Sequence, residues 1–345
     1  MLDLMKPKML QKGDKVATVS LSWGGAGDED ILWRYYQGKE RLEKVFGLEV
    51  VEMPHTLKGT EYIYLHPEKR AADLMQAFAD KSIKGIISCI GGDDSIRMLP
   101  YIDFNVIHNN PKIYTGYSDS TITHFMCLKG GLSSFYGVSI LNDFAENVTM
   151  SDYTVEWINK VMFSKEIIGE IPTSKEWTSQ RLKWVIDNKN TARTFEKNWG
   201  YELIQGIENV QGRLMGGCME VIEMMKGTEL FPEISCFDNT ILFLETSEEQ
   251  PPLWWFENNL RNYGMLGILN RINGIIIAKP QSARFYEEYK PIITKVLTEF
   301  GRGNMPVLYN ASFGHNEPKC CIPMGAMAEI NCLNKSFSIL ESGVK

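Results

Sequence analysis

The sequence contains no apolar run long enough to cross a membrane. Its longest strongly apolar stretch, Gly274–Ala278, has the length of a β-strand, whereas a membrane-spanning helix needs about 20 apolar residues. The N-terminal residues Met1–Pro7 also lack the apolar run that follows the basic residue of a secretory signal. The sequence therefore predicts neither a membrane-spanning segment nor an export signal.

Positive charge is in deficit. The chain carries 36 Lys and Arg against 43 Asp and Glu, a formal net charge of -7, and no block of basic residues offsets this balance. Proteins that bind nucleic acid polymers need a basic surface that neutralises phosphate groups. We therefore expect no nucleic acid polymer as a partner.

The cysteines lack any recognisable pattern. They number 7, an odd set without the paired spacing of a zinc site, and Cys320 and Cys321 are adjacent. Adjacent cysteines suit neither a zinc knuckle nor an easy disulfide. We therefore expect reduced thiols in a cytoplasmic protein, with no metal ion and no cofactor.

What the sequence does contain is the composition of a folded protein with more than one domain. Hydrophobic residues make up 44% of its 345 residues, and a chain of this length exceeds the size at which a single core usually stops growing. In its first half, buried-strand patterns at Lys15–Leu21, Leu48–Met53 and Gly85–Ile90 alternate with helix patterns at Glu29–Phe46 and Glu68–Lys81. This alternation predicts an α/β fold with a parallel sheet, whose working loops lie at the carboxyl ends of its strands.

The second half reads as a separate unit after a long irregular segment. Thr173–Tyr201 shows no sustained periodicity, and we interpret it as an ordered loop or lid. The patterns that follow indicate a unit beginning at Gly212–Met225, strands at Asn239–Leu244, Gly274–Ala278 and Met305–Asn310, helices at Pro252–Tyr263 and Glu287–Phe300, and a hairpin of Ala328–Cys332 with Ser336–Leu340.

The stretch from Lys112 to Thr121 is the most informative of the chain. A β-rich run breaks at Gly116 and delivers Ser118 to the start of a helical pattern, which is typical of a nucleophile elbow that exposes a serine hydroxyl near helix N-terminal amides. The usual elbow motif has glycine where this chain has Ser120. An ordinary helix N-cap made by Ser118 or Ser120 is the alternative interpretation.

A nucleophilic serine needs a base and a group that orients the base. Of the 5 histidines, His315 is the candidate base, because it follows the strand Met305–Asn310 in a loop fixed by glycine and proline. Glu245 is the candidate acid, because it ends the strand Asn239–Leu244. A solvated loop histidine, and a glutamate that joins Glu248 and Glu249 on a solvated acidic face, are the competing interpretations. The order serine, acid, histidine is that of the α/β-hydrolases.

Taken together, these motifs make the chain similar to the serine LD-carboxypeptidase family, within which it most resembles the branch of microcin C immunity proteins. The resemblance runs through nearly the whole chain. It rests on Gly13–Ala17, Gly91–Ser95, Gly116–Asp119, Gly212–Gly217, Leu244–Glu248 and Gly314-His315.

The resemblance implies a flavodoxin-like parallel-sheet N-terminal domain and a smaller, barrel-like (swivelling) C-terminal domain, with the active site at their interface. Ser118 would be the nucleophile, His315 the base and Glu245 its orienting acid. Backbone N–H groups of Gly91, Gly92 and Asp119 would form the oxyanion hole. We expect an N-terminal nucleophile domain at 1–165, an inter-domain loop or lid at 166–200, and a C-terminal domain that supplies the glutamate and the histidine at 201–345.

The family resemblance also implies two substrate classes. Immunity-type members cleave the amide between an aminoacyl group and a nucleotide-like moiety, whereas murein-recycling members cleave between an L- and a D-centre of a cell-wall peptide. Trp177 and Trp184 in the lid would stack an adenine in the first class, and in the alternative interpretation they pack the domain interface. We expect the immunity type, and by resemblance a homodimer.

Two functions of other classes stay open on sequence alone. The same cleft could hold a peptide or nucleotide without cutting it, and contact among Ser118, Glu245 and His315 distinguishes the two cases. A nucleotide-dependent enzyme could use Gly24–Gly27, but this run lacks the spacing of the dinucleotide fingerprint and the ending of a phosphate-binding loop.

Overall fold

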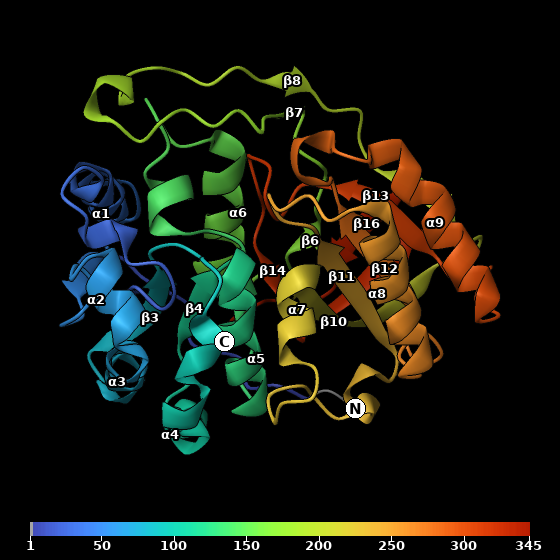
Figure 1. Ribbon diagram of the computed structural model, residues 1–345, viewed down its shortest axis with the longest axis horizontal. Helices are drawn as coiled ribbons and strands as arrows, with labels where there is room; N and C mark the ends of the chain where they lie inside the picture. The colour runs from blue at the N-terminus through green and yellow to red at the C-terminus, as the bar shows by residue number, and fades with distance from the viewer. Residues whose placement is uncertain (1–2) are drawn as a thin grey trace.

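The computed structural model describes residues 3–345, so residues 1 and 2 of the expected N-terminal domain lie outside the described part. Two domains lie side by side, each built around its own sheet (Figure 1). Among residues 3–345, no helix combines the length and the apolar composition needed to cross a bilayer.

The first sheet has six strands in the order β14-β5-β4-β3-β1-β2. Its strands are β1 (Lys15–Val19), β2 (Glu49–Glu52), β3 (Ile83–Ser88), β4 (Ile113–Gly116), β5 (Phe135–Tyr136) and β14 (Ile322–Pro323). All pairs from β2 to β5 are parallel. The strand order 2-1-3-4-5 is that of flavodoxin-like folds, so the predicted parallel-sheet N-terminal domain is confirmed.

Helices and single turns flank this sheet. They are η1 (Gly25–Gly27), α1 (Leu32–Phe46), α2 (Thr60–Leu65), α3 (Pro67–Ala79), η2 (Ser95–Tyr101), α4 (Phe104–Asn109), η3 (Ser118–Ser120), α5 (Thr121–Lys129), η4 (Ile140–Phe144, a π-helical turn) and α6 (Asp152–Met162). The predicted end of the first helix is confirmed, because Gly47 adopts a left-handed conformation at the C-cap of α1.

The second sheet has eight strands in the order β6-β16-β15-β10-β11-β12-β13-β9. They are β6 (Gly169–Glu170), β9 (Glu202–Gln205), β10 (Val210–Cys218), β11 (Thr240–Glu245), β12 (Gly274–Ala278), β13 (Val307–Ala311), β15 (Met327–Asn331) and β16 (Ser336–Ile339). Strands β10 to β13 are parallel and the outer pairs are antiparallel. The separate C-terminal sheet domain is therefore confirmed. Its helices and turns are α7 (Met219–Met225), η6 (Ile234–Phe237), α8 (Leu253–Met265), η7 (Gln281–Ala283) and α9 (Tyr286–Glu299).

A segment that holds β7 (Glu176–Trp177), η5 (Ile186–Asn188) and β8 (Glu196–Lys197) runs along one end of the molecule, beside both domains (Figure 1). We call residues 173–201 the lid. Strands β7 and β8 pair only with each other, and Thr178 exchanges two backbone hydrogen bonds with Glu317, in the loop that carries His315. The lid is thus tied by backbone hydrogen bonds to the loop that carries His315.

Two short strands modify the expected division of the chain. β14 pairs with β5 of the first sheet, so a segment after His315 returns to the N-terminal domain. β6 pairs with β16 of the second sheet, so residues 166–200 begin with an edge strand rather than a loop. Strands of two residues leave no periodic signal in a sequence, which is why neither was predicted.

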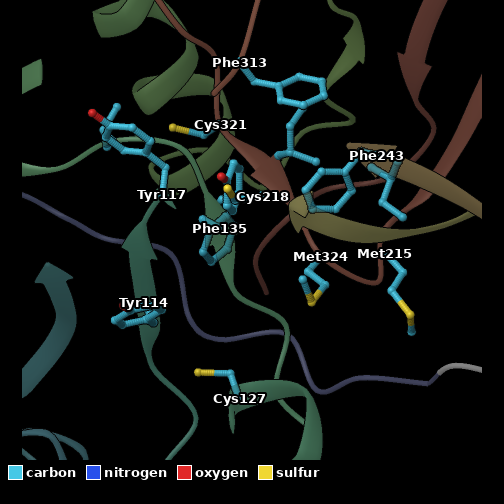
Figure 2. Close-up of a cluster of buried hydrophobic side chains, with 14 of the residues drawn as sticks. Tyr114, Tyr117, Cys127, Phe135, Met215, Cys218, Phe243, Phe313, Cys321 and Met324 are labelled. Carbon is cyan, nitrogen blue, oxygen red and sulfur yellow. The ribbon is translucent and has the colours of Figure 1, made fainter. Parts of the chain in front are cut away.

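The two domains share a continuous buried core. Figure 2 shows Phe135 and Tyr117 of the first domain beside Phe243 and Phe313 of the second. The ring of Tyr136 lies 5.6 Å from that of Phe243, whose ring lies 5.9 Å from that of Phe313, centroid to centroid. Burial of such large rings on both sides holds the two carboxyl-terminal sheet edges at a fixed distance.

Candidate active site

Ser118 lies on a sharp turn at the carboxyl end of β4. The four residues of β4 are fully buried, and the chain then turns through η3 into α5. Ser118 has φ 61°, a left-handed conformation that is strained for a residue other than glycine. Neither Ser118 nor Ser120 makes a side-chain capping bond at η3 or α5, so the N-cap interpretation is wrong.

The turn after β3 approaches this serine closely. A Cβ placed on Gly91 would lie 2.8 Å from Ser118 Cβ and 3.3 Å from the backbone nitrogen of Asp119. Only glycine fits between these groups. The structure therefore brings Gly91 to the Ser118 hydroxyl and the Asp119 amide. Gly92 lies next to it, against Ser22 and Trp23.

Ser118, His315 and Glu245 form one hydrogen-bonded chain. Ser118 Oγ lies 3.0 Å from His315 Nε2, and His315 Nδ1 lies 2.7 Å from Glu245 Oε2. Glu245 is the last residue of β11, and its side chain is fully buried. Gly314 has φ 84°, and a Cβ there would lie 2.8 Å from Glu245 Oε2, so this glycine permits the approach of the two loops.

Tyr136 connects the elbow to the acid. Its hydroxyl accepts a hydrogen bond from the Ser118 backbone N–H at 3.1 Å and donates one to Glu245 Oε1. Burial, and then the Glu245 carboxylate, raise the pKa of Tyr136 well above its usual value. The phenol therefore stays protonated and holds the second oxygen of Glu245, while the first faces His315.

A second carboxylate reaches the same histidine. Glu248 Oε2 lies 2.9 Å from His315 Nε2, the nitrogen that also contacts Ser118 Oγ, and the Glu248 side chain is 40% exposed. Arg181 of the lid contacts Glu248 Oε1 at 3.3 Å. The sequence pattern favoured a solvated acidic face, or the first turn of the next helix, for Glu248. This residue lies instead before α8, beside the histidine.

These carboxylates set the protonation of the histidine. Burial alone would lower the pKa of His315, but Glu245 and Glu248 together overcome this effect and raise it to about 10. His315 Nε2 with a proton can donate to both Ser118 Oγ and Glu248, which are otherwise two groups competing for one atom. The arrangement of these side chains is therefore that of the imidazolium form.

A cavity of about 550 Å³ opens over these residues. Ser118, His315 and Glu248 line it together with Gly91 and Gly92. Such a volume matches a small-molecule site rather than a polymer groove. The rest of its lining includes residues of the lid, Trp23 after β1, Arg34 of α1, and Asn142, Glu146 and Asn147 in and after η4.

Trp184 and Trp23 form an aromatic wall of this cavity. Both line it, and their rings are stacked with centroids 6.1 Å apart. The Arg34 guanidinium lies over the Trp184 ring at 4.8 Å and donates to Leu141 O and Asn147 Oδ1. The sequence pattern identifies Trp184 but gives no signal for Trp23, which precedes the glycine run that was considered only for phosphate binding.

Trp177, the other tryptophan expected to bind substrate, does not line the cavity. It lies in β7, where pairing with β8 and the ammonium of Lys279, 4.5 Å from its ring centroid, hold it apart. Trp177 and Trp184 therefore lie in different surroundings, and of these two only Trp184 is placed to contact a molecule in the cavity.

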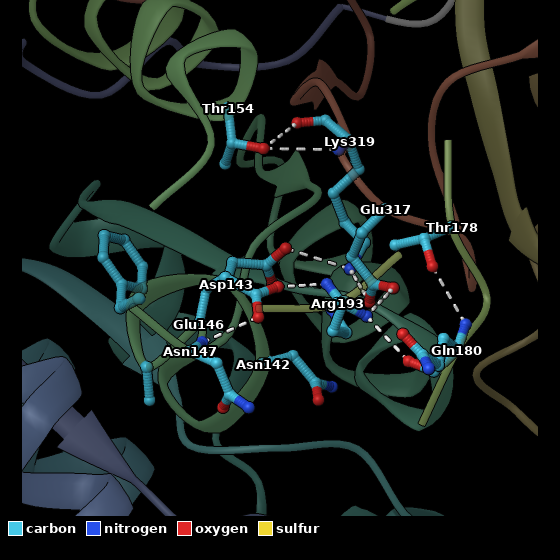
Figure 3. Close-up of polar contacts among 12 residues, drawn as sticks. Asn142, Asp143, Glu146, Asn147, Thr154, Thr178, Gln180, Arg193, Glu317 and Lys319 are labelled. Atoms are coloured by element: carbon cyan, nitrogen blue, oxygen red, sulfur yellow. Dashed lines mark hydrogen bonds and ion pairs between the residues drawn. The ribbon is translucent and has the colours of Figure 1, made fainter. Parts of the chain in front are cut away.

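A buried charge network fixes the lid beside the site (Figure 3). Arg193 of the lid pairs with Glu146 and, at 2.9 Å, with Glu317. Lys319 pairs with Glu317 at 3.1 Å and with Asp143 at 2.9 Å. Burial would raise the pKa of Glu317, but Lys319 and Arg193 hold it well below its usual range. The Lys319 ammonium is therefore already paired with two carboxylates of the protein.

Arg97 and the cysteines stand apart from this site. Arg97 pairs with Asp94 and covers the ring of Tyr64, and it is not among the residues that line the cavity. Within residues 3–345, no group of three or more His, Cys, Asp or Glu side chains is placed to hold a metal ion. All seven cysteines are free thiols.

Comparison with known families assigns both domains. Residues 16–137 match the LD-carboxypeptidase N-terminal domain, and residues 211–330 match the LD-carboxypeptidase C-terminal domain. Ser118 falls in the first match, and Glu245 and His315 fall in the second.

Individual relatives cover nearly the full chain. The Microcin C7 self-immunity protein MccF of Escherichia coli is 29% identical over 320 residues, which is 89% of this chain and 88% of the relative. A probable murein peptide carboxypeptidase of Bacillus subtilis is 27% identical over 346 residues, with 98% and 95% covered.

Solved structures match equally well. A crystal structure of an MccF-like protein from Streptococcus pneumoniae in complex with AMP has a TM-score of 0.87 and 33% identity, with 95% of this chain and 98% of that chain covered. Microcin C7 self-immunity protein MccF in complex with aspartyl sulfamoyl adenosine has a TM-score of 0.85 and 26% identity, with 99% and 100% covered.

Proposed function

The chain belongs to the LD-carboxypeptidase family and is a serine carboxypeptidase-type enzyme, and on this premise we propose that it hydrolyses the amide bond of an aminoacyl-nucleotide, as a self-immunity enzyme does. The observation that carries the proposal is the contact chain of Ser118, His315 and Glu245 at the floor of a cavity walled by Trp23 and Trp184. A non-catalytic binding module would have no need of that chain.

In the proposed reaction, Ser118 Oγ attacks the carbonyl carbon of the scissile amide while neutral His315 accepts the hydroxyl proton at Nε2. Glu245, held by Tyr136, fixes the tautomer of His315 and stabilises the imidazolium that forms. Backbone N–H groups of Gly91, Gly92 and Asp119 would receive the negative charge on the carbonyl oxygen.

The tetrahedral intermediate then collapses. His315 returns the proton to the leaving nitrogen, the carbon–nitrogen bond breaks, and the acyl group remains esterified to Ser118. A water molecule, deprotonated by His315, attacks this ester, and the bond between the acyl carbon and Ser118 Oγ breaks. His315 returns the proton to Ser118 Oγ, so the acid is released and the free serine is regenerated. Each step needs only the three side chains and the backbone donors.

The aromatic wall supports the nucleotide side of the proposal. A base stacked on an aromatic ring is worth about 1–3 kcal/mol, and two tryptophans line the same cavity as Ser118. Solved structures similar to this chain contain AMP and aspartyl sulfamoyl adenosine. Hydrolysis of a murein tetrapeptide is the second candidate, favoured by the relative that is a probable murein peptide carboxypeptidase.

One experiment tests both candidates. The purified protein is incubated with an aminoacyl-sulfamoyl adenosine and, separately, with a murein tetrapeptide, and the products are analysed by mass spectrometry. We expect the free amino acid and sulfamoyl adenosine from the first. Ser118→Ala, His315→Ala and Glu245→Ala are each expected to abolish this turnover, and full activity in Ser118→Ala would refute the proposal.

We further propose that the enzyme works in the cytoplasm as a homodimer. Seven free thiols suit a reducing compartment, and the family resemblance supports the dimer. Cell fractionation and light scattering on the purified protein measure the two properties directly.

A further inference from the structure

The contact of Glu248 with His315 is incompatible with the proposed reaction, so Glu248 has to move before catalysis. His315 must accept a proton from Ser118 through Nε2, so this nitrogen must present a lone pair to Ser118 Oγ. A carboxylate offers only acceptor atoms, and Glu248 Oε2 lies 2.9 Å from the same nitrogen. When His315 is neutral, Glu248 therefore repels Nε2 and has to turn to another partner.

The structure limits what that partner can be. Glu248 reaches into the cavity from the chain just after β11, and its exposure of 40% leaves it free to move, unlike the fully buried Glu245. The cations of Arg193 and Lys319 are already held by Glu146, Glu317 and Asp143. Arg181 contacts Glu248 only at 3.3 Å, and its side chain is 59% exposed, so this pair is weak.

We propose that Glu248 is the specificity-determining carboxylate for the acyl side of the substrate, and that it leaves His315 to bind a primary ammonium on the carbon next to the scissile carbonyl. This inference rests on the proposed function for the type of compound that enters the cavity. It extends that function from an amide bond to a defined class of acyl group.

The exchange couples recognition to catalysis. In the free enzyme, Glu248 and Ser118 share the proton on His315 Nε2. Arrival of an ammonium group gives Glu248 a full cation of its own, whereas the N–H of His315 is shared between Glu248 and Ser118 Oγ. Withdrawal of Glu248 favours loss of the proton from Nε2, and His315 becomes the base. A compound without the ammonium leaves Glu248 in contact with His315 Nε2, so this nitrogen keeps its proton.

Binding to an inactive protein tests this inference apart from turnover. The full chain carrying Ser118→Ala is titrated, by calorimetry, with alanyl sulfamoyl adenosine and with propionyl sulfamoyl adenosine. The second compound lacks only the amino group of the first, so bulk and nucleoside are matched. We expect the alanyl compound to bind at least about tenfold more tightly, as one charged hydrogen bond provides.

The same titrations are repeated with Glu248→Gln added, which keeps the size of the side chain and removes its charge. The preference is expected to fall below about threefold, because a neutral amide no longer attracts the ammonium as a full charge does. The matched control adds Glu288→Gln, which removes an exposed carboxylate from the first turn of α9 and is expected to keep the preference.

Each outcome decides the matter. Equal affinities for the two compounds in the Ser118→Ala protein, an unchanged preference in Glu248→Gln, or no binding of either compound would overturn the inference. If the binding preference depends on Glu248 but the wild-type enzyme does not cleave alanyl sulfamoyl adenosine, the proposed function fails and Glu248 keeps its role in recognition. If the wild-type enzyme cleaves alanyl sulfamoyl adenosine but the Ser118→Ala protein binds the two compounds equally, the proposed function stands and the inference about Glu248 fails.

Discussion

His315 Nε2 lies 3.0 Å from Ser118 Oγ although the two residues are 197 positions apart and come from different domains. The contact exists because β4 and β13 end at the domain boundary, where Tyr136 of the first domain also holds Glu245 of the second. The catalytic arrangement we propose is therefore sensitive to how the domains pack, and each residue at the boundary offers a separate test.

The strained backbone of Ser118 predicts a difference between two inactive variants. Ser118→Ala and Ser118→Gly both lose the hydroxyl, and turnover should fall by about 10,000-fold or more in each. Alanine keeps the strain of φ 61°, which costs about 1–2 kcal/mol. Glycine avoids this strain, but its larger loss of conformational entropy on folding cancels part of the gain. Urea unfolding is expected to show Ser118→Gly as the more stable of the two, by up to about 1 kcal/mol. Equal stability would mean that the elbow is not strained.

The close approach of Gly91 predicts a loss of activity without a loss of fold. Gly91→Ala places a methyl group 3.0 Å from Ser118 Oγ, where the carbonyl oxygen of the substrate would bind. The Gly91 N–H stays in place, but the methyl group keeps the substrate oxygen away from it, and loss of one oxyanion donor typically costs about 100- to 1000-fold in kcat. Steady-state kinetics and circular dichroism measure the two properties. Gly303→Ala is a control for glycine replacement as such, because its backbone is not left-handed and a Cβ there meets only Thr298 Oγ1, at 3.5 Å.

The pH dependence of the enzyme should respond to Glu248. Burial lowers the pKa of His315, but Glu245 and Glu248 raise it to about 10 in the free enzyme. The acidic limb of kcat/KM reports the free enzyme, so it should lie well above the usual histidine value of about 6.5. Removal of the Glu248 charge destabilises the imidazolium. Glu248→Gln is therefore expected to move this limb to lower pH, which a purely structural residue would not do. A limb at the same pH in both proteins would contradict the assignment.

Arg193 is expected to hold the lid in place. Arg193→Met leaves Glu146 and Glu317 buried, with side chains 14% and 15% exposed, without their shared cation. Breaking a buried ion pair from one side typically costs about 3–5 kcal/mol. Hydrogen exchange should rise in residues 173–201 before it rises elsewhere. The matched control is Arg181→Met, also in the lid but largely exposed, which should change the free energy of unfolding by less than about 1 kcal/mol.

The candidate site could be found in the sequence wherever its residues stand directly at strand ends. Gly274–Ala278 was predicted with the bounds of β12, and Ser118 and Glu245 were found because a buried strand leads straight to each. Glu248 and Arg193 lie in segments without periodicity, and their roles come from partners far away in the sequence. No local pattern records that Glu248 bends back to His315.

Trp184 provides the sharpest test of the nucleotide. Trp184→Ala removes one ring of the aromatic wall, and loss of a stacked base should lower kcat/KM for an aminoacyl-sulfamoyl adenosine by about 5- to 150-fold. A murein tetrapeptide has no base to stack, so any cleavage of it should change little. Trp177→Ala, which removes a lid tryptophan outside the cavity, controls for disturbance of the lid. Equal losses on both substrates would mean that Trp184 only packs the lid against Trp23 and Arg34.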